Sequence, residues 1–169
     1  MSKSDGVFIF IGTYASEVDA RADYDVVKDL HAGGVVGTYD AAVITKDEKG
    51  KVHVDQDETT TRHGAWGGAA AGALIGILFP PSIIGSALVG AAIGGVSGHL
   101  WKGMSRTDVK EFGEVIDAGE AALVVVGETS IENSIEKAGL KPQRKVAKEL
   151  QVDKSDVDHA VAEAAGSMT

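Results

Sequence analysis

Two histidines bracket the most unusual segment of this sequence, the uncharged residues 64–98. His63 precedes the segment and His99 follows it, and two imidazoles would supply the first half of a metal site. A third ligand would have to come from another part of the chain or from another subunit. We therefore favour solvated or interfacial histidines, with a proton-sensitive gate as the alternative, because histidine titrates near neutral pH.

Other chemically suggestive patterns point away from catalysis. Residues 64–72 are rich in glycine, but they follow a polar segment and lack the Gly-Lys-Ser/Thr ending of a nucleotide-binding loop. Residues 59–61 are three threonines without an identifiable base. Asp156, His159 and Glu163 share one face of a predicted helix, where a solvated charged face is the favoured interpretation. The sequence predicts no enzyme, no metal site and no cofactor.

The spacing of glycines is the strongest pattern in the chain. Residues 64–98 contain ten glycines and eight alanines and no Asp, Glu, Lys, Arg or His. Small residues recur at every fourth position in two arms, on either side of a turn at residues 79–82. Residues i and i+4 share one face of a helix, so each arm would present a groove for close backbone packing, and this predicts self-association. The predicted oligomerisation positions are Gly64, Gly68, Gly72, Gly76, Ser86, Gly90, Gly94 and Gly98.

Aromatic and basic side chains gather at the open end of this predicted hairpin. Trp66 and Trp101 lie there, and Arg62, Lys102 and Arg106 flank the two arms. This combination is typical of an anchor at the membrane interface with a cytoplasmic base. The arms would be about 24 Å and about 30 Å long, against a hydrocarbon core of about 30 Å. We expect the hairpin to enter or dock on a lipid bilayer.

The larger apolar side chains of the hairpin require a partner. Leu74 and Leu78 lie on one row with Trp66, and we expect this row to face outward, toward lipid or a neighbouring copy. A membrane-bound homo-oligomer is the leading prediction. A soluble homo-oligomeric ring, shell or filament with the hairpins buried at its centre is the alternative. A small-molecule-binding regulatory domain is a third.

Composition restricts the compartment and the partners. The chain of 169 residues carries a net charge of −9, so nucleic acid is not an expected partner, because phosphate binding requires clustered Lys and Arg. The absence of cysteine fits the cytoplasm. The apolar run at residues 7–11 is too short for a signal peptide. We expect a soluble part in the cytoplasm and a hairpin at the cytoplasmic membrane, with a wholly cytoplasmic protein as the alternative.

The first third of the chain predicts alternating strands and helices. Residues 7–11 are apolar at every position, which is typical of a strand buried on both faces. A helix is expected to begin after Ser16, with Asp19 completing its cap, and to end at Gly33. Residues 39–54 predict a β-hairpin around a polar turn.

The last third continues the same pattern. Ser105 and Asp108 are expected to cap a helix that ends at Gly119, and residues 121–126 predict another buried strand. Short helices are then expected over residues 129–139, 142–150 and 156–165. Without the hairpin, the order strand, helix, strand, strand, helix, strand predicts an α+β fold, a ferredoxin-like (split βαβ) antiparallel sheet.

The predicted organisation has four parts. They are the first half of the ferredoxin-like domain (1–62), the inserted apolar glycine-zipper hairpin (63–102), the second half of that domain (103–139) and a C-terminal tail of short helices (140–169).

The chain resembles a family of small bacterial proteins that are usually described as membrane proteins of unknown function. The resemblance covers roughly residues 7–127 and depends on the order of the segments, on the hairpin turn 45–52, on the glycine-rich residues 64–72 and on residues 119–123. It implies a ferredoxin-like shell around a glycine-rich hairpin and a link to membranes, and it implies no activity or catalytic residue. We therefore expect a non-enzymatic protein that assembles with copies of itself in or on the cytoplasmic membrane.

Overall fold

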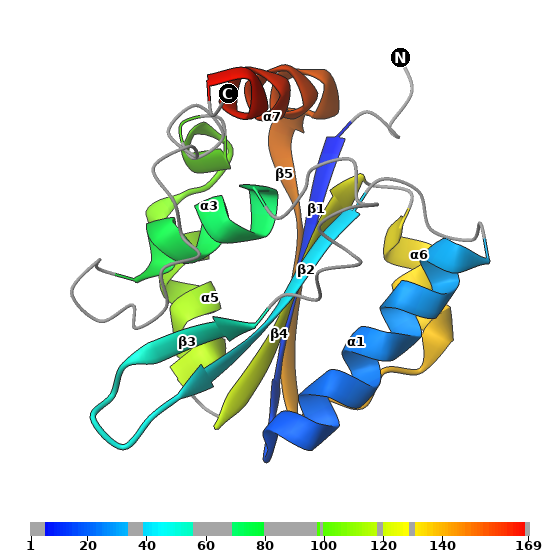
Figure 1. The fold of residues 1–169 in the computed structure, drawn as a ribbon, viewed down its shortest axis with the longest axis vertical. Helices are drawn as coiled ribbons and strands as arrows, with labels where there is room; N and C mark the ends of the chain where they lie inside the picture. The colour runs from blue at the N-terminus through cyan, green and yellow to red at the C-terminus, as the bar shows by residue number, and fades with distance from the viewer. Residues whose placement is uncertain are drawn as a thin grey trace.

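A five-stranded antiparallel sheet forms the centre of the described chain (Figure 1). The computed structural model describes residues 6–33, 39–55, 69–79, 98, 100–117, 120–128 and 131–167. The strands are β1 (Gly6–Tyr14), β2 (Tyr39–Lys46), β3 (Val52–Asp55), β4 (Ala121–Glu128) and β5 (Arg144–Asp153). The helices are α1 (Glu17–Ala32), α3 (Ala69–Leu78), α5 (Arg106–Asp117), α6 (Ile131–Ala138) and α7 (Lys154–Ser167). The predicted α+β class is confirmed.

The strand order is β3-β2-β4-β1-β5, and every neighbouring pair is antiparallel. Two helical crossovers result from this order. Strands β1 and β2 run parallel to each other, are joined through α1 and have β4 between them. Strands β4 and β5 also run parallel to each other, are joined through α6 and have β1 between them.

Helices cover both faces of the sheet. Figure 1 shows α1 and α6 on one side and α3 and α5 on the other, with α7 near one end of β5. Alternate residues of β1 consequently enter two separate cores. Phe8 and Phe10 pack under α1 and α6, whereas Ile9 and Ile11 pack under α3 and α5. The prediction that residues 7–11 are buried on both faces is confirmed.

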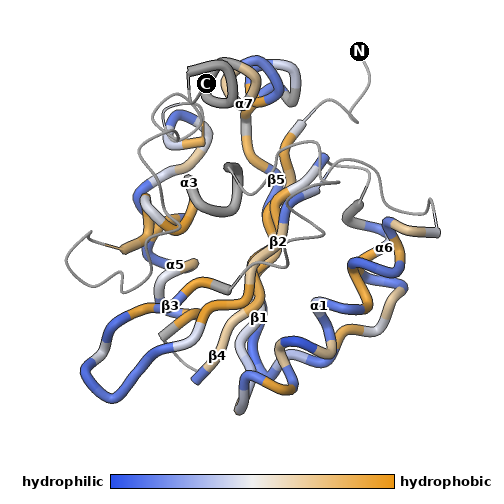
Figure 2. Tube along the Cα trace, viewed as in Figure 1, coloured by the Kyte–Doolittle hydropathy of each residue, from blue (hydrophilic) through white to orange (hydrophobic). Residues whose placement is uncertain are grey.

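Hydropathy follows this layered arrangement. Figure 2 shows hydrophobic residues along the central strands and hydrophilic residues at the turn between β2 and β3. In that turn, the Asp47 carboxylate accepts hydrogen bonds from the backbone N–H groups of Lys49 and Lys51, each at 2.9 Å. A hydrogen bond to His53 is the main reason that the pKa of Asp47 is lowered. The predicted β-hairpin over residues 39–54 is confirmed.

The predicted helix caps also form. The Ser16 hydroxyl accepts a hydrogen bond from the Asp19 N–H at 3.2 Å at the start of α1, and Gly33 is the C-cap. Ser105 and Asp108 exchange two hydrogen bonds of 3.0 Å at the start of α5. Such reciprocal bonds satisfy backbone N–H groups that have no partner within the helix.

The helix expected over residues 142–150 is wrong, because residues 144–150 belong to strand β5. Val146 and Leu150 have the i, i+4 spacing that is also typical of an amphipathic helix. Val146, Leu150 and Val152 also occupy alternate positions of a strand, on the face that packs with α5 and α7. Pairing of β5 along β1 decides between the two patterns, since strand preference depends mainly on context. The tail 140–169 therefore contains a strand followed by α7.

Helix α5 begins where predicted but lies in a different place. The predicted strand and helix order made it the partner of α1. In the structure α5 lies on the opposite face of the sheet, and α6 is the helix beside α1. The two-faced burial of the central strands requires a second helical layer, and α3 and α5 supply it.

Candidate functional site

The first arm of the predicted zipper contributes a helix, α3, that belongs to the α+β domain. Gly72 and Gly76 lie in α3, and Gly98 is helical and exposed. The other predicted oligomerisation and anchor positions lie outside the described residues: Arg62, Gly64, Trp66, Gly68, Ser86, Gly90 and Gly94. The zipper remains a prediction.

Helix α3 packs onto the sheet of its own chain. Leu74 and Ile75 are fully buried, and Phe79 just after the helix is buried with them. Helix α3 contacts β2, β4, α5 and α7. The expectation that Leu74 faces outward is therefore wrong, because an uncovered sheet face offers it more apolar contact. Among the described helices, none is both long enough and apolar enough to cross a membrane.

The base of the predicted insertion presents an aromatic side chain at the surface. Trp101 has 54% of its surface exposed, Lys102 follows it directly, Arg106 begins α5 shortly after, and both basic residues are exposed. We call these three residues the Trp101 surface. Leu100 is fully buried next to Trp101, so the local backbone is fixed to the core. The turn that follows is held by the Met104 N–H, which donates to the Trp101 carbonyl at 3.2 Å.

A polar cluster connects this surface to the rest of the domain. The Lys148 ammonium of β5 lies 2.6 Å from Asp108 Oδ1 and also pairs with Glu111, both on α5. The hydrogen bond from Lys148 is the main cause that lowers the pKa of Asp108, and the same bond raises the pKa of Lys148. Helix α5, and with it the Trp101 surface, is thereby tied to β5.

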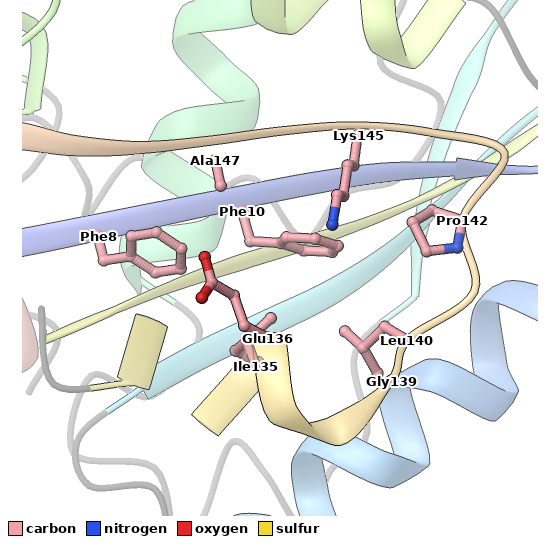
Figure 3. A pocket seen from close by; sticks show the side chains of 9 residues that line it. All are labelled: Phe8, Phe10, Ile135, Glu136, Gly139, Leu140, Pro142, Lys145 and Ala147. Carbon is pink, nitrogen blue, oxygen red and sulfur yellow. The ribbon is translucent and has the colours of Figure 1, made fainter. Parts of the chain in front are cut away.

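A pocket opens on the other face of the sheet, between α6 and the strands β1 and β5 (Figure 3). It has a volume of about 200 Å³. Its lining is mostly apolar, with one carboxylate and one ammonium group. The lining residues are Phe8, Phe10, Ile135, Glu136, Gly139, Leu140, Pro142, Lys145 and Ala147.

A buried polar pair fixes the loop that forms one wall of this pocket. The Tyr14 hydroxyl donates to Asp23 Oδ2 at 2.7 Å, and the backbone N–H of Lys141 donates to the same oxygen at 2.8 Å. Burial, followed by the bond to Asp23, raises the pKa of Tyr14 far above its ordinary value. Gly139 ends α6 with a φ of +70°, a conformation that glycine adopts without strain. The loop is thus positioned from α1, β1 and α6 together.

Metal-ligating residue types do not assemble into a site in the described part of the chain. His63 and His99 lie outside it. Asp156 and His159 are exposed on α7, as expected for a solvated face, and the side chain of Glu163 is not among those described. Within the described residues, no group of three His, Cys, Asp or Glu side chains could hold a metal ion.

Sequence reasoning missed the pocket because it assigned residues 142–150 to a helix. The alternation of Val146, Leu150 and Val152 was the signal that could have placed a strand there. With β5 beside β1, Lys145 and Ala147 come opposite Gly12 and Phe10. The pocket therefore depends on a strand pairing between residues more than a hundred positions apart.

Comparison with known proteins gives a family without an assigned function. Residues 65–162 match the family described as "Protein of unknown function (DUF1269)". The match begins in the predicted insertion and continues through β5 into α7, whereas the resemblance seen in the sequence ended near residue 127. No curated protein and no solved structure matches the chain. Since the match covers more than half of the sequence, the chain belongs to the DUF1269 family of proteins of unknown function.

Proposed function

We propose that this is a non-enzymatic protein that assembles with copies of itself in or on the cytoplasmic membrane through the glycine-rich insertion. The observation that carries the proposal is the exposure of Trp101 at the base of that insertion. The α+β domain would remain in the cytoplasm. The lipid bilayer and a second copy of the chain are the proposed partners.

The surroundings of Trp101 distinguish it from an ordinary exposed apolar residue. Lys102 and Arg106 are exposed and add positive charge to the segment that carries Trp101, and this combination suits the headgroup region of a membrane. Val18 is more exposed, at 75%, but it lies on α1 between Glu17 and Asp19. Single exposed apolar residues among charges are common and need no partner. Val18 therefore provides a natural control.

Tryptophan fluorescence tests the proposal directly. The chain has two tryptophans, so Trp66→Phe leaves Trp101 as the only indole. We expect its emission to shift to shorter wavelength when vesicles of phosphatidylethanolamine and phosphatidylglycerol are added, because the indole leaves water. A shift that follows protein concentration without vesicles would favour the soluble assembly. No shift under either condition would overturn the proposal.

A pair of variants distinguishes vesicle binding through Trp101 from nonspecific binding through any exposed apolar side chain. We expect Trp101→Ser to reduce partition into vesicles by roughly 10-fold or more, since burying a large apolar side chain is worth about 1.5–3 kcal/mol. Val18→Ser should leave partition unchanged. Equal effects of the two substitutions would contradict a specific role for Trp101.

The soluble homo-oligomer is the second candidate, and the burial of α3 against its own sheet favours it over insertion of that helix into a bilayer. Leu74 and Ile75 join the core of their own chain, which keeps this part of the insertion against the domain. Light scattering of detergent-free protein, after removal of membranes by centrifugation, separates the two candidates. Recovery in salt-washed membranes supports the first, and a soluble particle of many subunits supports the second.

We also propose that the fold is ferredoxin-like, with β1, α1, β2, β4, α6 and β5 as its βαββαβ elements. The two split crossovers support this assignment. Strand β3 then extends one edge of the sheet, and α3 and α5 form a layer inserted between β3 and β4. An experimental structure with a different order of these six elements would contradict it.

A further inference from the structure

We propose that the pocket between α6 and β5 binds a free amino acid with an apolar side chain, in its zwitterionic form. The inference is independent of self-assembly, because the pocket lies on the opposite face of the sheet from α3 and α5. It rests on the shape of the pocket, on its apolar floor and on two charges of opposite sign.

The apolar residues that line the pocket favour a ligand with an apolar group. Phe8 and Phe10 are buried in β1, and Ile135 and Leu140 come from α6 and the loop after it. A volume of about 200 Å³ is below the 300–1,000 Å³ of pockets for drug-sized ligands. The pocket therefore suits a small ligand. A branched aliphatic side chain with its backbone atoms is of this size.

Two charged side chains provide the polar contacts. Figure 3 shows Lys145 extending from β5 toward Phe10 and Glu136 extending from α6 toward Phe8. In the described part of the chain, neither Glu136 nor Lys145 makes an ion pair or a side-chain hydrogen bond, with each other or with another residue. Within the described residues, both charges are therefore unpaired. Most exposed charged side chains are only solvated. Glu136 and Lys145 differ from these because both line the same apolar pocket.

An amino acid matches this arrangement better than a ligand with one charge. Its carboxylate can accept hydrogen bonds from the Lys145 ammonium while its own ammonium donates to the Glu136 carboxylate. Its side chain then lies against the apolar lining of the pocket. A carboxylic acid without an amine would place its charge near Glu136 without compensation, and an amine without a carboxylate would do the same near Lys145.

The walls of the pocket are already fixed before a ligand arrives. A Cβ on Gly12 would lie 2.8 Å from Cβ of Pro142, so glycine at this position lets the loop rest directly on β1. The Gln143 N–H donates to the Thr13 carbonyl at 2.8 Å, and Asp23 holds Lys141 by its backbone. A preformed site spends little binding free energy on ordering the loop.

Calorimetric titration with L-leucine and two analogues of matched shape tests the proposal. The probes are L-leucine, 4-methylpentanoate, which lacks the amine, and 3-methylbutylamine, which lacks the carboxylate. We expect L-leucine to bind and each analogue to bind roughly 10-fold or more weakly, because each loses a charge-assisted contact. Failure of L-leucine to bind at millimolar concentration overturns the proposal, and so does equal binding of either analogue.

Three single substitutions test which side chain binds the carboxylate of L-leucine and which binds its ammonium group. Lys145→Gln should weaken L-leucine binding roughly 10-fold and leave the weak binding of 3-methylbutylamine unchanged, since that amine has no carboxylate. Glu136→Gln should weaken L-leucine binding and spare 4-methylpentanoate. Lys137→Gln changes an exposed lysine of α6 outside the pocket and should have no effect.

The substituted side chains are exposed, so all three variants are expected to unfold at the wild-type temperature. If the variants are folded and none of them changes the affinity for L-leucine, the amino acid does not bind at this pocket and the proposal is wrong. Ala147→Leu provides a second measurement, because it fills the pocket without changing either charge. Unchanged leucine binding by this variant would also contradict the assignment.

Discussion

At the scale of single residues, Asp23 joins segments that are far apart in the sequence. It is buried, and it joins the hydroxyl of Tyr14 on β1 to the backbone of Lys141, which lies 118 positions away in the sequence. A buried carboxylate with two donors is stabilising, whereas removal of one donor leaves part of its hydrogen-bonding capacity unsatisfied. The pair therefore fixes the pocket loop as well as α1.

Tyr14→Phe should lower the free energy of unfolding by about 1–2 kcal/mol at pH 7. The pKa of Tyr14 in the folded protein is raised from its ordinary value of 10.0, so the unfolded chain loses this proton first. The advantage of the wild type over Tyr14→Phe is thus complete below pH 10 and declines above it, by about 1.4 kcal/mol per pH unit. Urea unfolding of both proteins from pH 8 to 11 measures this decline. A constant difference would contradict the buried hydrogen bond.

Gly12→Ala should destabilise the protein by about 1–3 kcal/mol, because the new methyl group would overlap with the rigid ring of Pro142 and approach Phe10. Gly113→Ala is the matched control. A Cβ on Gly113, within α5, meets nothing within 4 Å, and alanine favours a helix over glycine by about 1 kcal/mol. The two substitutions should therefore shift the midpoint of thermal unfolding in opposite directions. A stabilising Gly12→Ala would show that the loop does not lie against β1.

At the scale of elements, the capping residues of α5 have two functions. Asp108 accepts the Ser105 N–H and pairs with Lys148 of β5, so it both begins the helix and attaches it to the sheet. The sequence pattern around Ser105 predicts the first function. The second depends on the position of β5, which that pattern does not contain.

Asp108→Asn should cost about 1 kcal/mol at pH 7, since the pair with Lys148 is partly exposed. The pKa of Asp108 is lowered from its ordinary value of 3.8, so this contribution is present above that pH and is lost as the pH falls below it. The wild type and Asp108→Asn should consequently converge in stability in acid. Chemical denaturation at pH 7 and pH 3 tests this, with Glu114→Gln as an exposed control on the same helix.

Leu74→Ala tests the packing of α3. Leu74 is fully buried against the sheet, so truncation should cost about 2–5 kcal/mol. Leu78→Ala should cost less, because that side chain is only partly buried. Differential scanning calorimetry of detergent-free protein compares the two variants. Equal unfolding temperatures for Leu74→Ala and the wild type would place α3 away from its own sheet and restore the outward orientation.

At the scale of the whole molecule, the net charge of −9 acts against self-association, because acidic copies repel one another. Apolar contacts through the insertion and the Trp101 surface would have to overcome this repulsion. Screening shortens the range of the repulsion to about 10 Å at 0.1 M salt and leaves apolar contacts intact. The mass of the assembly, measured by light scattering, should therefore rise with salt concentration. A mass that falls as salt is added would instead indicate ion pairs between copies.

The sequence by itself determined the features that depend on neighbouring residues. The apolar runs of β1 and β4, the caps at Ser16 and Ser105, and the hairpin between β2 and β3 were all predictable, because each pattern lies within a few positions. Only the tertiary structure decided that β5 is a strand, that α3 covers its own sheet and that Lys145 and Glu136 line one pocket. These outcomes depend on burial and on strand pairing between distant segments, and such energies are absent from any local window of sequence.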